Sequence, residues 1–206
     1  MGRTARYDND MVLDAALAIL QREGMRALSA SRVCQELGAP SGSLYHRFAS
    51  RDALLAELWL RCAERFQSGY FAALSAPGDP RLAAHAAVRW FIERARAAPA
   101  ETRVLMSYRR EDLSDGDWPA TVQVRARALA VAHKQARADY AARLLWPDGQ
   151  VDVPRLEYAL LGLPYAAVHA ESRAGAKTQR AAVEWVCIAL DALLAACWPP
   201  AAPVST

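Results

Sequence analysis

The apolar residues of this chain recur at helical spacing from residue 9 to residue 198. In the first such stretch they share one helical face and comprise Val12, Ala15, Ala16, Ile19 and Leu20. No stretch alternates apolar and polar residues in the way that a half-buried strand does. Proline, glycine and capping residues separate one apolar stripe from the next. The pattern therefore predicts an all-α protein of about nine helices.

The helix ends follow from residues that start or stop a helix. Ser50 and Asp79 are favourable N-caps, and Gly24 stops the first helix. Pro164 lies inside a helical stripe, where it should kink the helix or perturb the hydrogen bond to Leu160. The expected helices span residues 9 to 23, 30 to 37, 41 to 48, 50 to 74, 80 to 98, 99 to 112, 119 to 146, 154 to 171 and 178 to 198.

Residues 29 to 48 predict two short helices joined by a tight turn. Ser29 can cap the first helix, and Gly38 ends it because glycine adopts the left-handed conformation without cost. In the second helix Leu44 and Phe48 lie four apart on the face that packs inward. The opposite face carries Gly42, Ser43, His46 and Arg47. A helix–turn–helix leaves such a face free to enter the major groove of DNA.

At these residues the chain resembles the DNA-binding domain of the TetR family of bacterial transcription repressors. The resemblance rests on Leu37-Gly38, on the run from Gly42 to Phe48 and on the run from Ser50 to Leu55, and it covers roughly residues 8 to 60. Three positions depart from the usual family pattern: Pro40 stands for serine, Ser43 for threonine and Arg51 for lysine. Pro40 offers neither a hydroxyl nor an N–H for a DNA contact in the first turn.

The resemblance and the outward face together predict the residues that contact DNA. Gly42 lets the backbone approach the groove, while Ser43 and Arg47 can each reach a base or a phosphate. The resemblance implies that the hydroxyl of Tyr45 meets a phosphate, and Arg51 should also meet one. Alternatively, Ser43 only solvates the helix and Arg51 only pairs with a neighbouring acid. The predicted set is Ser29, Ser41, Gly42, Ser43, Tyr45, His46, Arg47 and Arg51.

Composition narrows the class of protein further. The 206 residues are 53% hydrophobic, carry a net charge of +3 and include no uncharged apolar run of about 18 residues. The four cysteines show no Cys-x-x-Cys spacing, so we expect a reduced, cytoplasmic protein without a membrane anchor. There is no phosphate loop, nucleophile elbow or metal-binding histidine motif. We therefore expect no enzyme, no metal and no cofactor.

Residues 154 to 198 predict a dimer interface. Their two apolar stripes are too wide for one core face, although a fully buried helix pair within one large domain would also account for them. Similar helices build the four-helix dimer interface of TetR-like proteins, and a palindromic operator requires a dimer. The predicted interface residues are Leu156, Leu160, Leu163, Ala167, Trp185, Ala189 and Leu193.

The resemblance also implies an effector cavity among the later helices. That part of the chain is rich in aromatic and sulfur-containing residues, so we expect a largely apolar or aromatic effector. The polar candidates are Arg109, His133, Arg137 and His169, although a place on the surface or behind the lining accounts better for each of them. The predicted effector-binding residues are Trp59, Cys62, Phe66, Trp90, Met106, Tyr108, His133, Tyr140, Tyr165 and His169.

These observations favour one function over two alternatives. We expect residues 1 to 48 to form the helix–turn–helix domain and residues 49 to 206 a helical ligand-binding and dimerisation domain. The whole chain would act as a homodimeric repressor on double-stranded operator DNA, released by a small molecule. One alternative is a DNA binder without a ligand; another is a helical enzyme or small-molecule carrier that kept the N-terminal motif.

Overall fold

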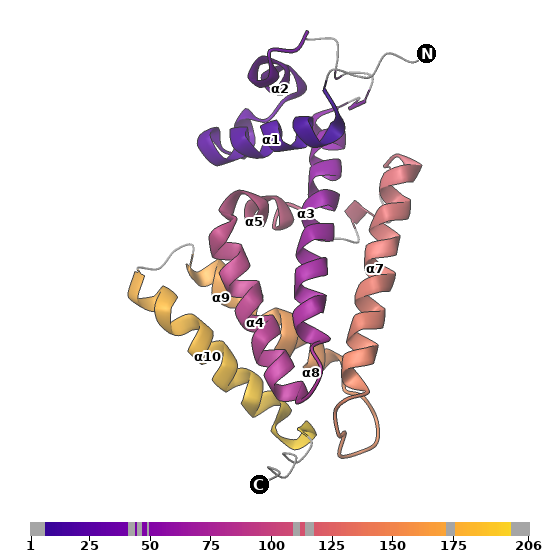
Figure 1. Ribbon diagram of the computed structural model, residues 1–206, viewed down its shortest axis with the longest axis vertical. Helices are drawn as coiled ribbons and strands as arrows, with labels where there is room; N and C mark the ends of the chain where they lie inside the picture. The colour runs from indigo at the N-terminus through magenta and orange to yellow at the C-terminus, as the bar shows by residue number, and fades with distance from the viewer. Residues whose placement is uncertain are drawn as a thin grey trace. The chain divides into compact units, whose positions relative to one another are not determined.

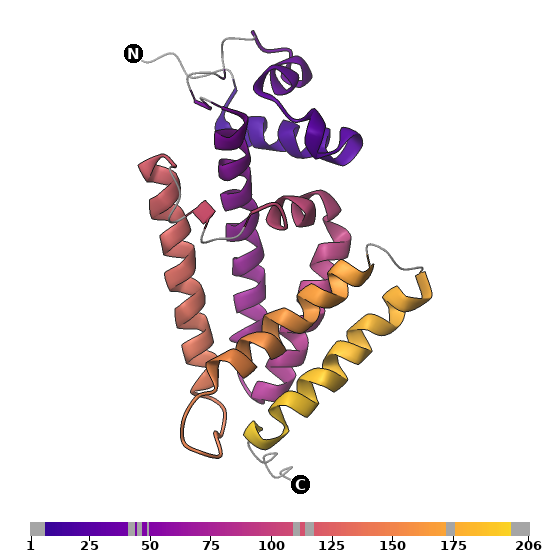
Figure 2. The same ribbon diagram turned by 180° about the vertical axis from the view of Figure 1, so that it is seen from behind.

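The computed structural model describes residues 7–40, 44, 47–48, 50–108, 112–113, 118–171 and 176–198, and every regular element in these ranges is helical (Figures 1 and 2). The predicted fold class is thus confirmed over this part of the chain. The longer helices are α1 (Asn9–Glu23), α2 (Ala30–Leu37), α3 (Arg51–Leu74), α4 (Pro80–Ala97), α5 (Pro99–Leu105), α7 (Ala120–Ala141), α8 (Val153–Glu157), α9 (Leu163–Glu171) and α10 (Ala176–Leu194). None of them is both long and apolar enough to cross a membrane.

The first two helices begin and end at the residues that the sequence predicts. The side chain of Asp8 accepts the N–H of Met11 at 2.8 Å and caps α1. Gly24 ends this helix with φ +83°, a conformation that other residues rarely adopt. Gly38 ends α2 in the left-handed region with φ +62°, and its N–H donates to carbonyls of the last turn. Local chemistry therefore fixes the length of α1 and α2.

The helix α5 is shorter than predicted, because it ends at Leu105 rather than near residue 112. The hydroxyl of Ser107 donates to the carbonyl of Val104 at 2.6 Å. The indole N–H of Trp59 donates to the carbonyl of Leu105 at 3.2 Å. Both carbonyls would accept backbone N–H groups if the helix continued. A side chain from a distant helix therefore helps to end α5, which local sequence patterns do not reveal.

The helix α7 also ends early, at Ala141 instead of near residue 146. The chain turns after Ala141, and the N–H of Leu145 donates to the carbonyl of Cys197 at 2.8 Å. Arg143 donates from its guanidinium to the carbonyls of Leu74 and Ala76, at 2.9 and 2.8 Å. The hydrogen bond from Leu145 to Cys197 thus replaces the one to Ala141 that a continued helix would contain, and the Arg143 side chain holds the turn in place.

Contacts divide the chain into two units, one of Met1–Arg65 with Ala98–Ala130 and one of Phe66–Ala97 with Val131–Thr206. In the first unit α1 packs on α2 and on α5, as Figure 1 shows. Its interior holds apolar side chains from each of these helices and from the first half of α3. The predicted functional boundary after residue 48 is a separate matter and stays a prediction.

In the second unit α4, α9 and α10 pack against one another, and Figure 2 shows α9 and α10 side by side. A π-helical turn, Tyr158–Gly162, joins α8 to α9. Within this turn the N–H of Leu163 donates to the carbonyl of Tyr158, five residues earlier. Pro164 follows Leu163, two positions after the turn, so the predicted perturbation of this helix is confirmed.

Candidate functional site

The candidate reading head is the predicted helix of residues 41 to 48, and its three described residues are buried or exposed as the predicted stripe requires. Leu44 and Phe48 are buried, at 1% and 2% exposed, and Arg47 is exposed. The N–H of Phe48 donates to the carbonyl of Leu44 at 2.9 Å, which is a helical hydrogen bond. The guanidinium of Arg47 lies 3.4 Å from the side-chain oxygen of Asn9. The other predicted contacts of this segment, Ser41, Gly42, Ser43, Tyr45 and His46, lie outside the described residues.

Two further predicted DNA contacts have structural partners of their own. The hydroxyl of Ser29 accepts the N–H of Arg32 at 3.1 Å and so caps α2. Arg51 donates to the backbone carbonyls of Leu28 and Met25 at 2.9 and 2.7 Å. Its guanidinium therefore fastens the start of α3 to the segment before α2, a role that the sequence did not suggest. Side-chain exposure of 44% leaves Arg51 accessible to a phosphate.

An ion-pair ring holds α1 against α2 and thereby supports the reading head. Arg32 donates to Glu23 at 2.6 Å, and Arg22 donates to Glu36 at 2.7 Å. Arg32 also lies 3.1 Å from Glu36, and Arg22 lies 3.5 Å from Glu23, which closes the ring. The hydrogen bond from Arg32 lowers the pKa of Glu23, and the bond from Arg22 lowers the pKa of Glu36. All four side chains keep contact with solvent, so each pair contributes modestly to stability.

This segment also matches a known family. Residues 12–58 match the family model described as bacterial regulatory proteins of the tetR family. The chain carries the N-terminal domain of the TetR family. The match covers the buried stripe of α1, the capped helix α2, the Leu44 and Phe48 turn and the start of α3.

Solved structures of transcription regulators, several of them of the TetR family, share the fold over nearly the whole chain. A regulator from Marinobacter aquaeolei is 18% identical, with a TM-score of 0.59 over 93% of this chain and 96% of that one. The ketosteroid transcriptional regulator of Mycobacterium tuberculosis is 19% identical, with a TM-score of 0.61 over 97% and 98%. A TetR-family regulator from Streptomyces coelicolor is 20% identical, with a TM-score of 0.62 over 91% and 97%. None of the curated proteins matches the chain.

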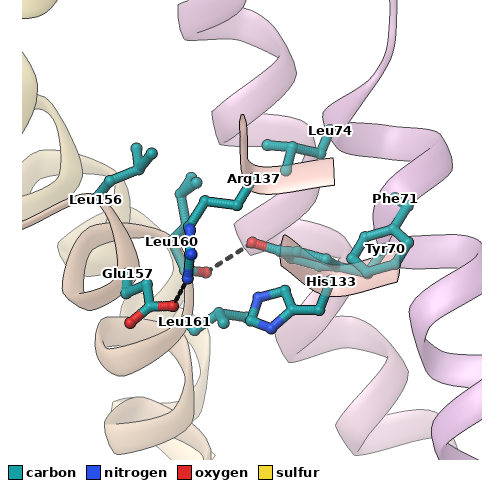
Figure 3. A pocket seen from close by; sticks show the side chains of 9 residues that line it. All are labelled: Tyr70, Phe71, Leu74, His133, Arg137, Leu156, Glu157, Leu160 and Leu161. Atoms are coloured by element: carbon teal, nitrogen blue, oxygen red, sulfur yellow. Dashed lines mark hydrogen bonds and ion pairs between the residues drawn. The ribbon is translucent and has the colours of Figure 1, made fainter. Parts of the chain in front are cut away.

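A small cavity lies in the second unit of this TetR fold (Figure 3). Its walls come from the end of α3, from α7 and from α8 with the π turn. Its volume of about 10 Å³ leaves room for roughly one water molecule. The lining residues are Tyr70, Phe71, Leu74, His133, Arg137, Leu156, Glu157, Leu160 and Leu161. The cavity is therefore largely apolar and, as it stands, closed to an organic ligand.

Two polar contacts join the walls of the cavity (Figure 3). The hydroxyl of Tyr70 donates to the carbonyl of Leu160 at 2.9 Å. Burial raises the pKa of Tyr70 far above its usual range, so this hydroxyl keeps its proton and remains a donor. Arg137 of α7 pairs with Glu157 of α8. The Arg137 side chain is 20% exposed and that of Glu157 is 42% exposed.

The predicted effector residues are divided between the two units. Trp59, Cys62, Met106 and Tyr108 belong to the first unit, and Trp59 and Cys62 are part of its core. The side chains of Trp59 and Cys62 fill a packed interior, and their role in effector binding stays a prediction. An aromatic residue fills a core as readily as it lines a cavity, so residue type alone did not separate the two roles.

Of the predicted residues in the second unit, His133 lines the cavity. Phe66 and Trp90 form an edge-to-face pair with centroids 5.1 Å apart. Tyr140 is 2% exposed and donates from its hydroxyl to the carbonyl of Pro80 at 2.8 Å. The remaining two predicted residues, Tyr165 and His169, are exposed and stack on each other along α9. Glu157 is not among the predicted residues, because nothing in the spacing of residues links α7 to α8.

An apolar groove runs along α9 and α10 on the second unit, with a volume of about 270 Å³. Trp185 is 56% exposed at this groove, which is unusual for so large an apolar side chain. Glu171 is 6% exposed and pairs with Arg96 at 3.0 Å, so its charge is balanced. The groove is lined by Leu163, Ala167, Ala170, Glu171, Ala182, Trp185, Val186 and Ala189.

The groove contains part of the predicted dimer interface, and two other predicted residues lie in the interior instead. Four of the seven predicted residues line it, namely Leu163, Ala167, Trp185 and Ala189. Leu193 is partly exposed on α10. Leu156 and Leu160 are buried, at 0% and 3% exposed, and face the chain's own interior. These two residues are therefore unavailable to a second copy, because their stripe packs against α3 and α7 at the cavity.

Proposed function

We propose that the chain is a transcriptional repressor that binds a palindromic operator as a homodimer and is released by a small effector. The observation that carries the proposal is the TetR-family domain at residues 12–58, with Leu44 and Phe48 buried and Arg47 exposed. In a helix–turn–helix this arrangement directs the outer face of the second helix to the major groove.

DNA reading is assigned to residues 1 to 48, and the remaining residues, 49 to 206, are assigned to effector binding and dimerisation. Ser43 and Arg47 face the base edges or phosphates, and Arg51 contacts the phosphate backbone from the start of α3. The exposure of Arg51 supports this second role beside its two backbone hydrogen bonds. Phosphate contacts set affinity and its dependence on salt, whereas base contacts set sequence preference.

Dimerisation is assigned to the groove along α9 and α10. A palindromic operator presents two half-sites related by a two-fold axis, so a dimer engages both at once. The exposed Trp185 and Ile188 on α10 support this face, since monomers rarely leave such side chains in water. The effector is assigned to the second unit, and release requires that it bind the form with low DNA affinity more tightly.

Selection of DNA sequences by the purified protein tests the proposal. We expect enrichment of an inverted repeat, with an affinity that falls steeply as salt rises. On that repeat Ser43→Ala should change which half-sites are preferred and cost on the order of 1–3 kcal/mol if Ser43 contacts a base. Ser68→Ala, which removes an exposed hydroxyl on α3, serves as the matched control. Absence of any enriched sequence would favour the alternative of an enzyme or carrier.

A further inference from the structure

We propose that the effector is a small carboxylic acid with an apolar body, and that its carboxylate displaces Glu157 from Arg137. The inference rests on the proposed function, in which the second unit binds the effector. The pairing of Arg137 with Glu157 across a largely apolar cavity carries it (Figure 3). In this view Glu157 occupies the place that the carboxylate of the effector takes.

The exposure of the two partners decides which charge the effector carries. Glu157 is 42% exposed, so it can turn into water when it leaves Arg137. Arg137 is 20% exposed and cannot regain much water, so it needs a negative partner where it stands. A cationic effector would pair with Glu157 and leave Arg137 without a partner inside the wall. The planar guanidinium also suits a carboxylate, because it donates two parallel hydrogen bonds.

The remaining walls select the body of the effector. Leucine side chains and the rings of Tyr70 and Phe71 make up most of the lining. His133 lies four residues before Arg137 on the same face of α7, and its ring stacks on Phe71 with centroids 6.2 Å apart. A ring or a short alkyl chain would bury its surface against these groups, while its acid reaches Arg137.

Room for such a molecule requires that α8 and the π turn move away from α3 and α7, because the cavity now holds about 10 Å³. Two contacts oppose this movement: the Arg137–Glu157 pair and the hydrogen bond from Tyr70 to Leu160. Displacement of Glu157 by the effector breaks the Arg137–Glu157 pair. The turn at Tyr158–Gly162 departs from the α-helical ladder, and such turns are common where helices change shape at functional sites.

Three compounds that differ only at the end group test the inference: 4-phenylbutyrate, 4-phenylbutanol and 4-phenylbutylamine. The full chain is titrated with each, and the thermal midpoint and the calorimetric Kd are measured. The acid should bind most tightly and raise the midpoint most. Glu157→Gln should tighten binding of the acid about tenfold, because the internal competitor is neutralised. Arg137→Gln should abolish the preference for the acid over the alcohol.

Controls keep the result interpretable. Arg137→Lys retains the charge and should keep a weakened preference for the acid, which covers the case in which Arg137→Gln misfolds. Glu93→Gln removes an exposed carboxylate on α4 and should leave all three affinities unchanged. Three results would each overturn the inference: preference for the amine, equal binding of the three compounds, or no binding of the acid by wild type and Glu157→Gln. The DNA selection experiment uses no effector. Its failure would therefore contradict the proposed repressor function, whereas failure of the compound titrations would contradict only the proposed effector class.

Discussion

The hydroxyl of Tyr70 donates a hydrogen bond of 2.9 Å to the carbonyl of Leu160, four residues before Pro164. In an α-helix that carbonyl would accept the N–H of residue 164, which proline lacks. Tyr70 is 2% exposed, so the helix receives the missing donor from a buried side chain of α3. The proline and the tyrosine thus form a matched pair, although 94 positions separate them in the sequence.

Removal of the Tyr70 hydroxyl should expose this dependence. Tyr70→Phe leaves the Leu160 carbonyl buried without its donor and should lower the free energy of unfolding by about 1–3 kcal/mol. In a Pro164→Ala background the same change should cost less than about half as much, because residue 164 regains an N–H. Tyr158→Phe, at a side chain 57% exposed, is the control. If Tyr70→Phe lowers the free energy of unfolding equally in both backgrounds, the Tyr70 hydrogen bond does not compensate for Pro164.

The close approach of α3 and α4 depends on Gly69. A Cβ at this position would lie 2.2 Å from Cζ2 of Trp90, whose indole also packs on Phe66. Alanine favours a helix over glycine by about 1 kcal/mol, but overpacking costs about 1–3 kcal/mol, so Gly69→Ala should destabilise. In a Trp90→Ala background the sign should reverse, and denaturant unfolding of the four proteins measures it. If Gly69→Ala stabilises the wild-type protein, the Trp90 indole must move aside at little cost in free energy.

Arg51 joins a structural role to the proposed phosphate contact, and two substitutions separate them. Arg51→Ala loses the hydrogen bonds to Leu28 and Met25, so it should lower the thermal midpoint. It should also weaken DNA binding equally on all sequences and reduce the salt slope by about one. Arg51→Lys should lower the midpoint but keep the slope, because the charge remains. An unchanged slope for Arg51→Ala would leave Arg51 a purely structural residue.

Acid should weaken the link between α4 and α10. Asp191 accepts hydrogen bonds from Nε and Nη2 of Arg81 at 2.8 and 2.7 Å, and these lower its pKa below the ordinary 3.8. A depressed carboxyl pKa contributes stability above the unfolded value and loses it as pH falls through the folded one. The stability difference between wild type and Asp191→Asn should therefore hold above about pH 5 and shrink below it.

His85 also contacts Asp191, with its Nε2 2.9 Å from the carboxylate. The acid titration is therefore done with His85→Gln in both proteins, so that neither protein retains the contact between the imidazole and position 191. The pH is then lowered past the ordinary carboxyl pKa. If the stability difference between the two proteins stays constant, the hydrogen bonds from Arg81 do not stabilise the charged form of Asp191.

Local chemistry predicted much of the fold. Gly24 and Gly38 end helices because left-handed φ favours glycine, and Asp8 and Ser29 cap helices because their oxygens reach nearby N–H groups. Pro164 marked the irregular turn for the same kind of reason. The ends of α5 and α7 escaped prediction because their carbonyls and amides bond to groups far away in the sequence.

The effector cavity was harder to predict than the reading head. Leu44 and Phe48 follow from helical spacing within eight residues, whereas the cavity forms where α3, α7 and α8 meet. Periodicity identifies the apolar face of each helix but not its neighbour, so Leu156 and Leu160 were placed on a dimer interface instead of the interior. The Arg137–Glu157 pair depends on that same packing.

The proposed dimer face makes one decisive prediction about mass. Trp185 on α10 is 56% exposed beside an apolar groove, so a second copy would bury it. At micromolar concentration sedimentation should give a mass near twice the 22.5 kDa of one chain. Trp185→Glu would bury an unpaired charge in the interface and should yield the single-chain mass. Val131→Glu, at a side chain 68% exposed on α7, should leave the dimer intact. A wild-type protein found only at 22.5 kDa would remove this face from the interface, and with it the simultaneous reading of two half-sites.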